Sequence, residues 1–185
     1  MELAFLAGPD LKVSDRWAAL EVSGLTADSR EVGPGFLFAA LPGVQFDGTK
    51  FISEAISRGA VAVLMAKGHD IAADWGVPLL QVDNPRSALA RMAARFYHRQ
   101  PSTIVAVTGT NGKTSVAAFV RQIWSQLGLK SASLGTVGLV TPDHTISLQH
   151  TTPEPVYLHK LLRQVAEEGI EHLAFEASSH GLAQN

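Results

Sequence analysis

The chain has 185 residues, 46% of them hydrophobic, and its 15 Lys and Arg against 17 Asp and Glu give a formal net charge of −2. That length suits one large domain or two small ones, and the slight acidic balance argues against a large nucleic-acid interface. No apolar run is long enough to span a bilayer, and the acidic start lacks the form of a secretory signal. The absence of cysteine excludes disulfides, thiolate catalysis and cysteine metal sites. These features predict a cytoplasmic protein that neither binds nucleic acid nor inserts into a membrane.

Residues 1–84 alternate short apolar runs with clusters of turn-forming residues, which predicts a small α/β domain. Strands are predicted at 36–41, 61–65 and 77–82. A helix is predicted between the first two strands, at 51–58, and Gly59 ends it.

Pro85 marks the start of a second segment, residues 85–185. Proline is favoured at the first position of a helix, and the alanine-rich, amphipathic stretch at 86–98 predicts one. We expect this helix to lead into a second α/β domain with a mostly parallel sheet. The four-residue motif D-N-P-R at 83–86 includes this proline and therefore lies at the predicted domain boundary.

A strand–loop–helix pattern opens that second domain. The run at 104–107 predicts a buried strand, and apolar positions at helical spacing predict a helix at 116–124. At the start of a helix, the free backbone N–H groups and the positive end of the helix dipole both favour a bound anion. Glycine has no side chain, so the loop backbone can approach the phosphates closely. Lys113 can reach the outer phosphates of ATP, and the Thr114 hydroxyl can ligate Mg²⁺. The predicted phosphate-binding residues are Gly109, Thr110, Asn111, Gly112, Lys113, Thr114 and Ser115.

This glycine loop departs from the usual G-x-x-x-x-G-K-[ST] pattern, because Val107 stands where the first glycine is expected. Turns use glycine and asparagine routinely, so a plain strand-to-helix turn is the alternative interpretation. The position between a strand and a helix favours phosphate binding.

Glu176 ends a predicted strand at 171–176, which follows a predicted strand at 130–134 and a predicted helix at 154–168. The carboxyl ends of parallel strands meet at one edge of a sheet, so we expect Glu176 to lie near the glycine loop. A carboxylate there can hold Mg²⁺, although an ordinary charged strand end is the alternative. The seven histidines show no ligand spacing, which argues against a zinc site.

The segment T-T-P-E at 151–154 has two interpretations that both stay open. Proline followed by an acid is typical of a helix start, and two hydroxyls at a helix start also suit an anion. After Glu176 the chain runs to residue 185 without a predicted closing helix. We therefore expect the chain to be a fragment of a longer protein.

Several motifs in order resemble the Mur ligase family over residues 25–185. They are D-S-R at 28–30, D-G at 47–48, T-G-T-N-G-K-T at 108–114, T-T-P at 151–153 and E-x-S-S-H-G-L at 176–182. The missing first glycine of the loop is a trait of that family. The resemblance implies a UDP-binding domain at 1–84 and part of a central ATP-binding domain at 85–185. It also implies a C-terminal amino-acid-binding domain that these residues do not include.

The resemblance further implies a ligase that uses ATP and Mg²⁺ to join a diamino acid to UDP-MurNAc-L-Ala-D-Glu through an acyl phosphate. Family frequency favours meso-diaminopimelate over L-lysine, and we expect a monomer. The chain alone is expected to be inactive. The alternatives are a short UDP-sugar- or nucleotide-binding module without catalysis, and another phosphate-loop enzyme such as a kinase or folylpolyglutamate synthase.

Residue roles carry over from the family position by position. Lys113 and Glu176 would be catalytic, and Thr114 and Glu176 would hold Mg²⁺. The D-N-P-R motif resembles one that recognises diaminopimelate in the C-terminal domain, but its position here gives it no such role. The residues expected to contact the UDP-muramyl substrate are Ala27, Ser29, Val44, Gln45, Phe46, His150, Thr151, Thr152, Ser178 and Gln184.

Overall fold

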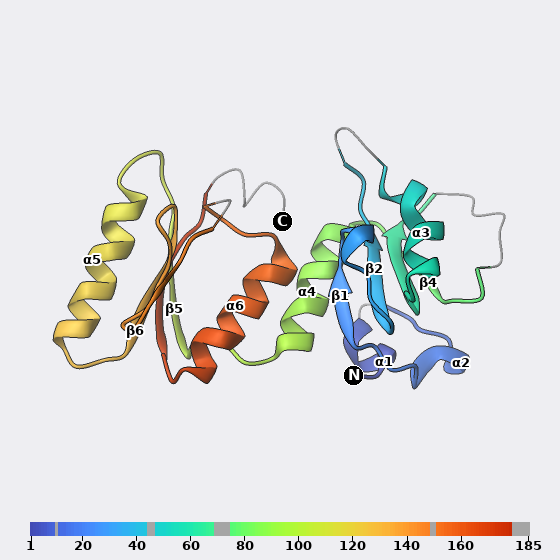
Figure 1. The fold of residues 1–185 in the computed structure, drawn as a ribbon, viewed down its shortest axis with the longest axis horizontal. Helices are drawn as coiled ribbons and strands as arrows, with labels where there is room; N and C mark the ends of the chain where they lie inside the picture. Colours follow the sequence, from blue (N-terminus) through green and yellow to red (C-terminus); the bar gives the residue numbers. More distant parts are fainter. Residues whose placement is uncertain (10, 44–46, 69–74, 149–150, 179–185) are drawn as a thin grey trace. The chain divides into compact units, whose positions relative to one another are not determined.

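The computed structural model describes residues 1–9, 11–43, 47–68, 75–148 and 151–178. The chain divides into two compact units, unit 1 (Met1–Phe96) and unit 2 (Tyr97–Asn185), and each is an α/β structure (Figure 1). The structural division therefore lies at the last residue of the helix that begins at Pro85. A functional division at residue 84 stays a prediction.

Unit 1 contains four strands and six helical segments within the described residues. In chain order they are α1 (Leu3–Ala7), α2 (Asp15–Ala18), β1 (Gly24–Thr26), η1 (Ser29–Glu31), β2 (Phe36–Ala40), η2 (Gly48–Phe51), α3 (Ile52–Ser57), β3 (Ala62–Ala66), β4 (Leu79–Val82) and α4 (Pro85–Tyr97), whose last residue already belongs to unit 2. The predicted strands and helices of this region are confirmed to within a few residues at their ends. The short elements α1, α2 and β1 were not predicted, because each has too few residues to show a period.

The four strands of unit 1 form one parallel sheet in the order β1-β2-β3-β4. Successive side chains of a strand point to opposite faces, and both faces of this sheet are covered. On one face Ile52 of α3 packs in a core with Phe38 and Val63. Leu64 and Leu89 are also fully buried, and Figure 1 shows α3 and α4 on opposite sides of the sheet.

Unit 2 contains five strands and two long helices within the described residues. They are β5 (Thr103–Val107), α5 (Lys113–Gln126), β6 (Ser131–Gly135), β7 (Gly138–Val140), β8 (Thr145–Ile146), α6 (Pro155–Glu167) and β9 (His172–Glu176). The sheet order is β5-β9-β6-β7-β8, with β5, β9 and β6 parallel and β7 and β8 antiparallel. The expected mostly parallel sheet thus carries an antiparallel extension on one side.

Helices α5 and α6 lie on opposite faces of this sheet (Figure 1). On the α6 face, Leu161 and Val165 pack with Leu134 of β6, Leu139 of β7 and Leu173 of β9. No helix among the described residues is long and apolar enough to cross a membrane.

The prediction that β5 is buried was wrong. Ile104 and Val105 are 36% and 37% exposed, because β5 lies at the edge of the sheet with β9 as its strand neighbour. On α5, Phe119 and Ile123 are 60% and 56% exposed. The apolar periodicity correctly predicted a strand and a helix here, but it did not predict that these side chains would be exposed.

Candidate functional site

The glycine loop joins the end of β5 at Val107 to the start of α5 at Lys113, as the sequence predicted. Gly109 and Gly112 have φ angles of +142° and +78°, a region that side-chain-bearing residues rarely adopt. Gly112 is the residue that precedes the first turn of α5. The two glycines therefore set the path of the backbone into the helix.

Lys113 lies over this loop. Its Nζ donates to the carbonyl oxygens of Gly109 at 2.7 Å and Thr110 at 3.4 Å. The ammonium group thus sits beside the first turn of α5, where the backbone N–H groups and the helix dipole already favour negative charge.

Glu176 places a buried carboxylate next to this first turn. The parallel register pairs Val107 of β5 with Glu176 of β9, so the strand end meets the start of the loop. Glu176 is only 2% exposed, and its Oε2 accepts a hydrogen bond from Thr114 Oγ1 at 3.0 Å. The predicted proximity of Glu176 and Thr114 is therefore present in the structure.

Thr136 completes the surroundings of this carboxylate, and the sequence analysis did not identify it. Its backbone N–H donates to Glu176 Oε1 at 3.0 Å, and its hydroxyl donates to Oε2 at 3.3 Å. Burying a carboxylate is costly unless such donors surround it. A side chain on Gly135, the preceding residue, would collide with the Glu176 carboxyl group.

A usable signal for Thr136 was present in the sequence. It is a hydroxyl residue two positions after the strand predicted at 130–134, at the sheet edge where Glu176 was also expected. Which end groups meet depends on the strand order β9-β6, which local sequence does not reveal.

The oxygen set of Thr114 and Glu176 fits a magnesium ion. Mg²⁺ prefers hard oxygen ligands, and it commonly uses one or two protein groups together with phosphates and water. In the described part of the chain, no group of three or more His, Cys, Asp or Glu is arranged to hold a metal. Two protein oxygens beside the phosphate-binding loop suit a metal ion whose other ligands are phosphate and water.

Three of the predicted substrate residues form a hydroxyl cluster beside Glu176. Thr152 Oγ1 donates to the Glu176 carbonyl at 3.2 Å and lies 3.0 Å from Ser178 Oγ. Thr151 Oγ1 lies 3.1 Å from Thr136 Oγ1. The structure thus brings Thr151, Thr152 and Ser178 together, whereas His150 and Gln184 fall outside the described residues.

The helix after this cluster begins later than predicted. Glu154 caps α6 by accepting from the backbone N–H groups of Tyr157 and Val156, and Pro155 is the first helical residue. Pro153 precedes the helix and does not begin it. The Thr151 hydroxyl therefore bonds to Thr136 and the Thr152 hydroxyl to the Glu176 carbonyl, and Glu154 caps the helix instead.

In unit 1, two predicted substrate residues follow the end of β1. Ala27 is exposed, whereas Ser29 is buried and its hydroxyl donates to Glu54 Oε2 at 3.0 Å. Arg30 donates to the Asp28 carboxylate, with Nε 2.9 Å from Oδ1, and this contact lowers the pKa of Asp28. Val44, Gln45 and Phe46 lie outside the described residues.

The fold and this site define a class of α/β proteins in which a glycine-rich loop joins a parallel strand to a helix beside a strand-end carboxylate. Two family models match the chain: "Mur ligase family, catalytic domain" over residues 21–97 and "Mur ligase middle domain" over residues 107–185. The chain belongs to the Mur ligase family.

Similar proteins agree with this membership. A UDP-N-acetylmuramoyl-L-alanyl-D-glutamate–2,6-diaminopimelate ligase of Bradyrhizobium diazoefficiens is 54% identical over 184 residues, which cover 100% of this chain and 37% of the relative. The ligase of the same name from Caulobacter vibrioides is 46% identical, over 88% of this chain and 34% of the relative. The chain thus spans little more than a third of the length of these relatives.

Solved structures show the same fold. A structure of a UDP-N-acetylmuramoyl-L-alanyl-D-glutamate–2,6-diaminopimelate ligase matches with a TM-score of 0.80 and 28% identity, over 100% of this chain and 37% of that chain. A MurF ligase from Thermotoga maritima, solved in complex with ADP, matches with a TM-score of 0.57 and 23% identity, over 90% of this chain and 34% of that chain. The second likeness supports the fold alone.

Proposed function

We propose that this chain supplies the ATP site and part of the substrate site of a ligase that joins 2,6-diaminopimelate to UDP-MurNAc-L-Ala-D-Glu. The observation that carries the proposal is the buried Glu176 carboxylate beside Thr114 at the start of α5. The proposed reaction is the one for which the similar ligases are named. Meso-diaminopimelate is preferred to L-lysine as the acceptor for the same reason.

Residues 109–115 would bind the phosphates of ATP, with Lys113 exchanging its loop carbonyls for the outer phosphates. Thr114 and Glu176 would hold Mg²⁺, which when bound neutralises phosphate charge. The protein then has to position the glutamyl carboxylate for phosphorylation, and next the amine that displaces phosphate. Thr151, Thr152 and Ser178 lie beside Glu176, where their hydroxyls would orient the muramyl-peptide end.

Unit 1 would hold the uridine end of the substrate. Ala27 and Ser29 follow a strand end, and the bond from Ser29 to Glu54 fixes the start of η1. The proposal also includes the predicted substrate contacts of Val44, Gln45, Phe46, His150 and Gln184. Action in the cytoplasm as a monomer also stays a prediction.

The first test is the intact mass of the protein made from its own gene. A mass well above the 19.7 kDa of this chain agrees with a ligase that has further domains. A mass of 19.7 kDa favours the alternative of a binding module without catalysis. We expect residues 1–185 alone to form no tripeptide product, and measurable product would contradict that expectation.

The second test is ADP release by the longer protein with UDP-MurNAc-L-Ala-D-Glu and a panel of amino acids. We expect Lys113→Ala to abolish turnover, because charge-assisted contacts of about 1.5–3 kcal/mol are lost in binding and more in the transition state. The matched control is Lys160→Ala on the exposed side of α6, which should turn over at the parental rate. Parental turnover by Lys113→Ala would remove this lysine from the mechanism.

A further inference from the structure

Thr136 lies between the two parts of the proposed site in unit 2, although the proposed function gives it no role. On one side are Thr114 and Glu176, which would hold Mg²⁺ with ATP. On the other side is Thr151, which would contact the muramyl-peptide substrate. Thr136 Oγ1 is 3.3 Å from Glu176 Oε2 and 3.1 Å from Thr151 Oγ1, so this one hydroxyl joins the two parts.

The backbone holds Thr136 in place between these groups. It is the first of the two residues that join β6 to β7, and Gly135 pairs with Gly138 on either side of them. A connection of two residues fixes the register of a hairpin. The backbone N–H of Thr136 also donates to Glu176 Oε1 at 3.0 Å, and a side chain on Gly138 would collide with the carbonyl oxygen of Ile146. The hydroxyl proton of Thr136 can therefore change its direction while the residue stays in place.

This hydroxyl has one proton and two acceptors within reach. A threonine hydroxyl donates one hydrogen bond and can accept others. The Glu176 carboxylate is the stronger acceptor, because hydrogen bonds to an ionised group are roughly twice as strong as neutral ones. The Thr136 proton therefore points to Glu176, and the Thr136 oxygen accepts from the Thr151 hydroxyl. In this arrangement Thr151 donates into the protein and not toward a ligand.

A metal ion on Glu176 would change this order of bonds. Oε2 of Glu176 also accepts from Thr114 Oγ1 at 3.0 Å, and these two oxygens are the proposed metal ligands. Coordination of Mg²⁺ would neutralise the charge of Oε2 and weaken it as an acceptor. The better acceptor for Thr136 is then Thr151 Oγ1, and the Thr151 proton is released to point outward. UDP-MurNAc-L-Ala-D-Glu carries phosphate and carboxylate oxygens that can accept from it.

We propose that Thr136 is a positioning residue that couples the nucleotide side of the site to the substrate side. With Glu176 bound to Mg²⁺, the Thr136 hydroxyl donates to Thr151, and Thr151 donates to an anionic oxygen of the substrate. This role rests on the proposed function, which assigns the metal to Glu176 and the substrate to Thr151. Coupling between two ligands is reciprocal, so nucleotide strengthens substrate binding by the same factor as substrate strengthens nucleotide binding.

Calorimetry on the longer protein measures this coupling without turnover. UDP-MurNAc-L-Ala-D-Glu is titrated with and without saturating Mg²⁺ and a non-hydrolysable ATP analogue. The parental protein should bind the substrate about five- to tenfold more tightly with the analogue, because it gains one charge-assisted hydrogen bond. In Thr136→Val this gain should fall below about twofold, whereas Thr136→Ser keeps the hydroxyl and should retain the gain.

The titration without the analogue distinguishes positioning from a structural defect. Thr136→Val should then bind the substrate at least as tightly as the parental protein, because Thr151 no longer donates to Thr136. A damaged site would bind more weakly in both titrations. Thr151→Val should also abolish the gain, and adding Thr136→Val to it should cause no further loss.

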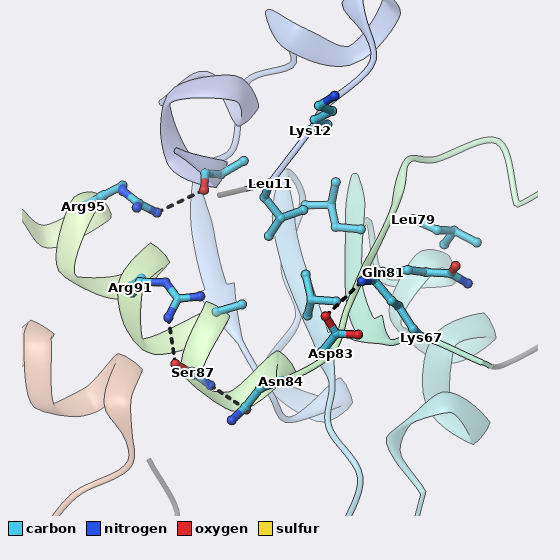
Figure 2. A pocket seen from close by; sticks show the side chains of 14 residues that line it. Leu11, Lys12, Lys67, Leu79, Gln81, Asp83, Asn84, Ser87, Arg91 and Arg95 are labelled. Atoms are coloured by element: carbon cyan, nitrogen blue, oxygen red, sulfur yellow. Dashed lines mark hydrogen bonds and ion pairs between the residues drawn. The ribbon is translucent and has the colours of Figure 1, made fainter. Parts of the chain in front are cut away.

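The control variant removes a hydrogen-bonded hydroxyl from unit 1. Ser87 Oγ accepts from Arg91 Nη1 at 2.8 Å, on the wall of a cavity that shares no lining residue with the site around Glu176 (Figure 2). Ser87→Ala should therefore keep the full gain.

The outcomes separate the role of Thr136 from the proposed function. If the parental protein binds both ligands and Thr136→Val keeps the full gain, the role of Thr136 is overturned and the proposed function stands. The same holds if the parental protein binds both ligands without any gain. If the parental protein fails to bind the analogue or the substrate, both proposals are overturned.

Discussion

The two units use the same strand–helix alternation but differ in how they treat their apolar side chains. In unit 1, helices cover both faces of the parallel sheet, and Phe38 and Leu64 are fully buried. In unit 2, α6 covers one face, whereas Phe119 and Ile123 of α5 stay exposed. Apolar periodicity therefore identifies a helix and its contact face, but it does not show whether the described chain supplies the contact.

The polar ends of the two sheets also differ. In unit 2, Thr114 and Thr136 donate to a buried carboxylate, that of Glu176. In unit 1, Asp28 and Arg30 pair at the surface. The first arrangement costs free energy if a donor is lost, whereas the second is largely screened by water.

The largest expected effect contrasts the buried and exposed phenylalanines. Phe38→Ala in β2 should lower the free energy of unfolding by about 3–5 kcal/mol, because it leaves a cavity in a packed core. Phe119→Ala should change it by less than about 0.5 kcal/mol, since the side chain is 60% exposed. Urea unfolding followed by NMR reads the two units separately. A large loss for Phe119→Ala would show that its face is covered in solution.

A second, smaller effect tests the close packing around the carboxylate. Gly135→Ala should destabilise unit 2 by about 1–3 kcal/mol, because the added methyl group collides with Glu176, which is held by its donors. Gly33→Ala in unit 1 is the control, since its nearest neighbour would be 3.5 Å away. Equal thermal unfolding midpoints for the two variants would mean that Glu176 moves freely.

A third prediction concerns the Thr136 hydroxyl alone. Thr136→Val removes its contacts to Glu176 and Thr151 but keeps the backbone N–H bond, and it should cost about 0.5–1.5 kcal/mol of stability. Thr145→Val in β8 changes an exposed threonine and should be neutral in the same urea titration. If Thr136→Val is equally neutral, the hydroxyl does not help to hold the carboxylate.

The smallest effect concerns the surface pair of unit 1. The contact with Arg30 lowers the pKa of Asp28, so its stabilising contribution is present above about pH 4 and is lost as the pH falls through the lowered value. In Arg30→Gln the pKa of Asp28 should rise toward its usual value, as a carboxyl NMR titration would record. An unchanged pKa would assign the shift to the backbone N–H of residue 30, which also donates to Asp28.

Much of the fold followed from local sequence. Gly109 and Gly112 adopt backbone angles that other residues rarely reach, so the glycines in the sequence were enough to predict the loop. Pro85 begins α4 as predicted, because proline lacks only an N–H that a first helical position does not use. The T-T-P-E segment suggested that Pro153 begins the next helix, which was wrong. Either of the two nearby prolines could begin a helix, but Glu154 caps α6, so Pro155 is its first residue.

The sequence by itself determined the longer strands and helices, the glycine loop, and the carboxylate at the end of a strand, because these depend on neighbouring residues. Only the tertiary structure decided that β5 is an edge strand and that Thr136 meets Glu176. It decided both because it sets the strand order and the bond from the Thr136 backbone N–H to Glu176. Strand order and the meeting of distant side chains depend on contacts between residues far apart in the chain, which no local pattern encodes.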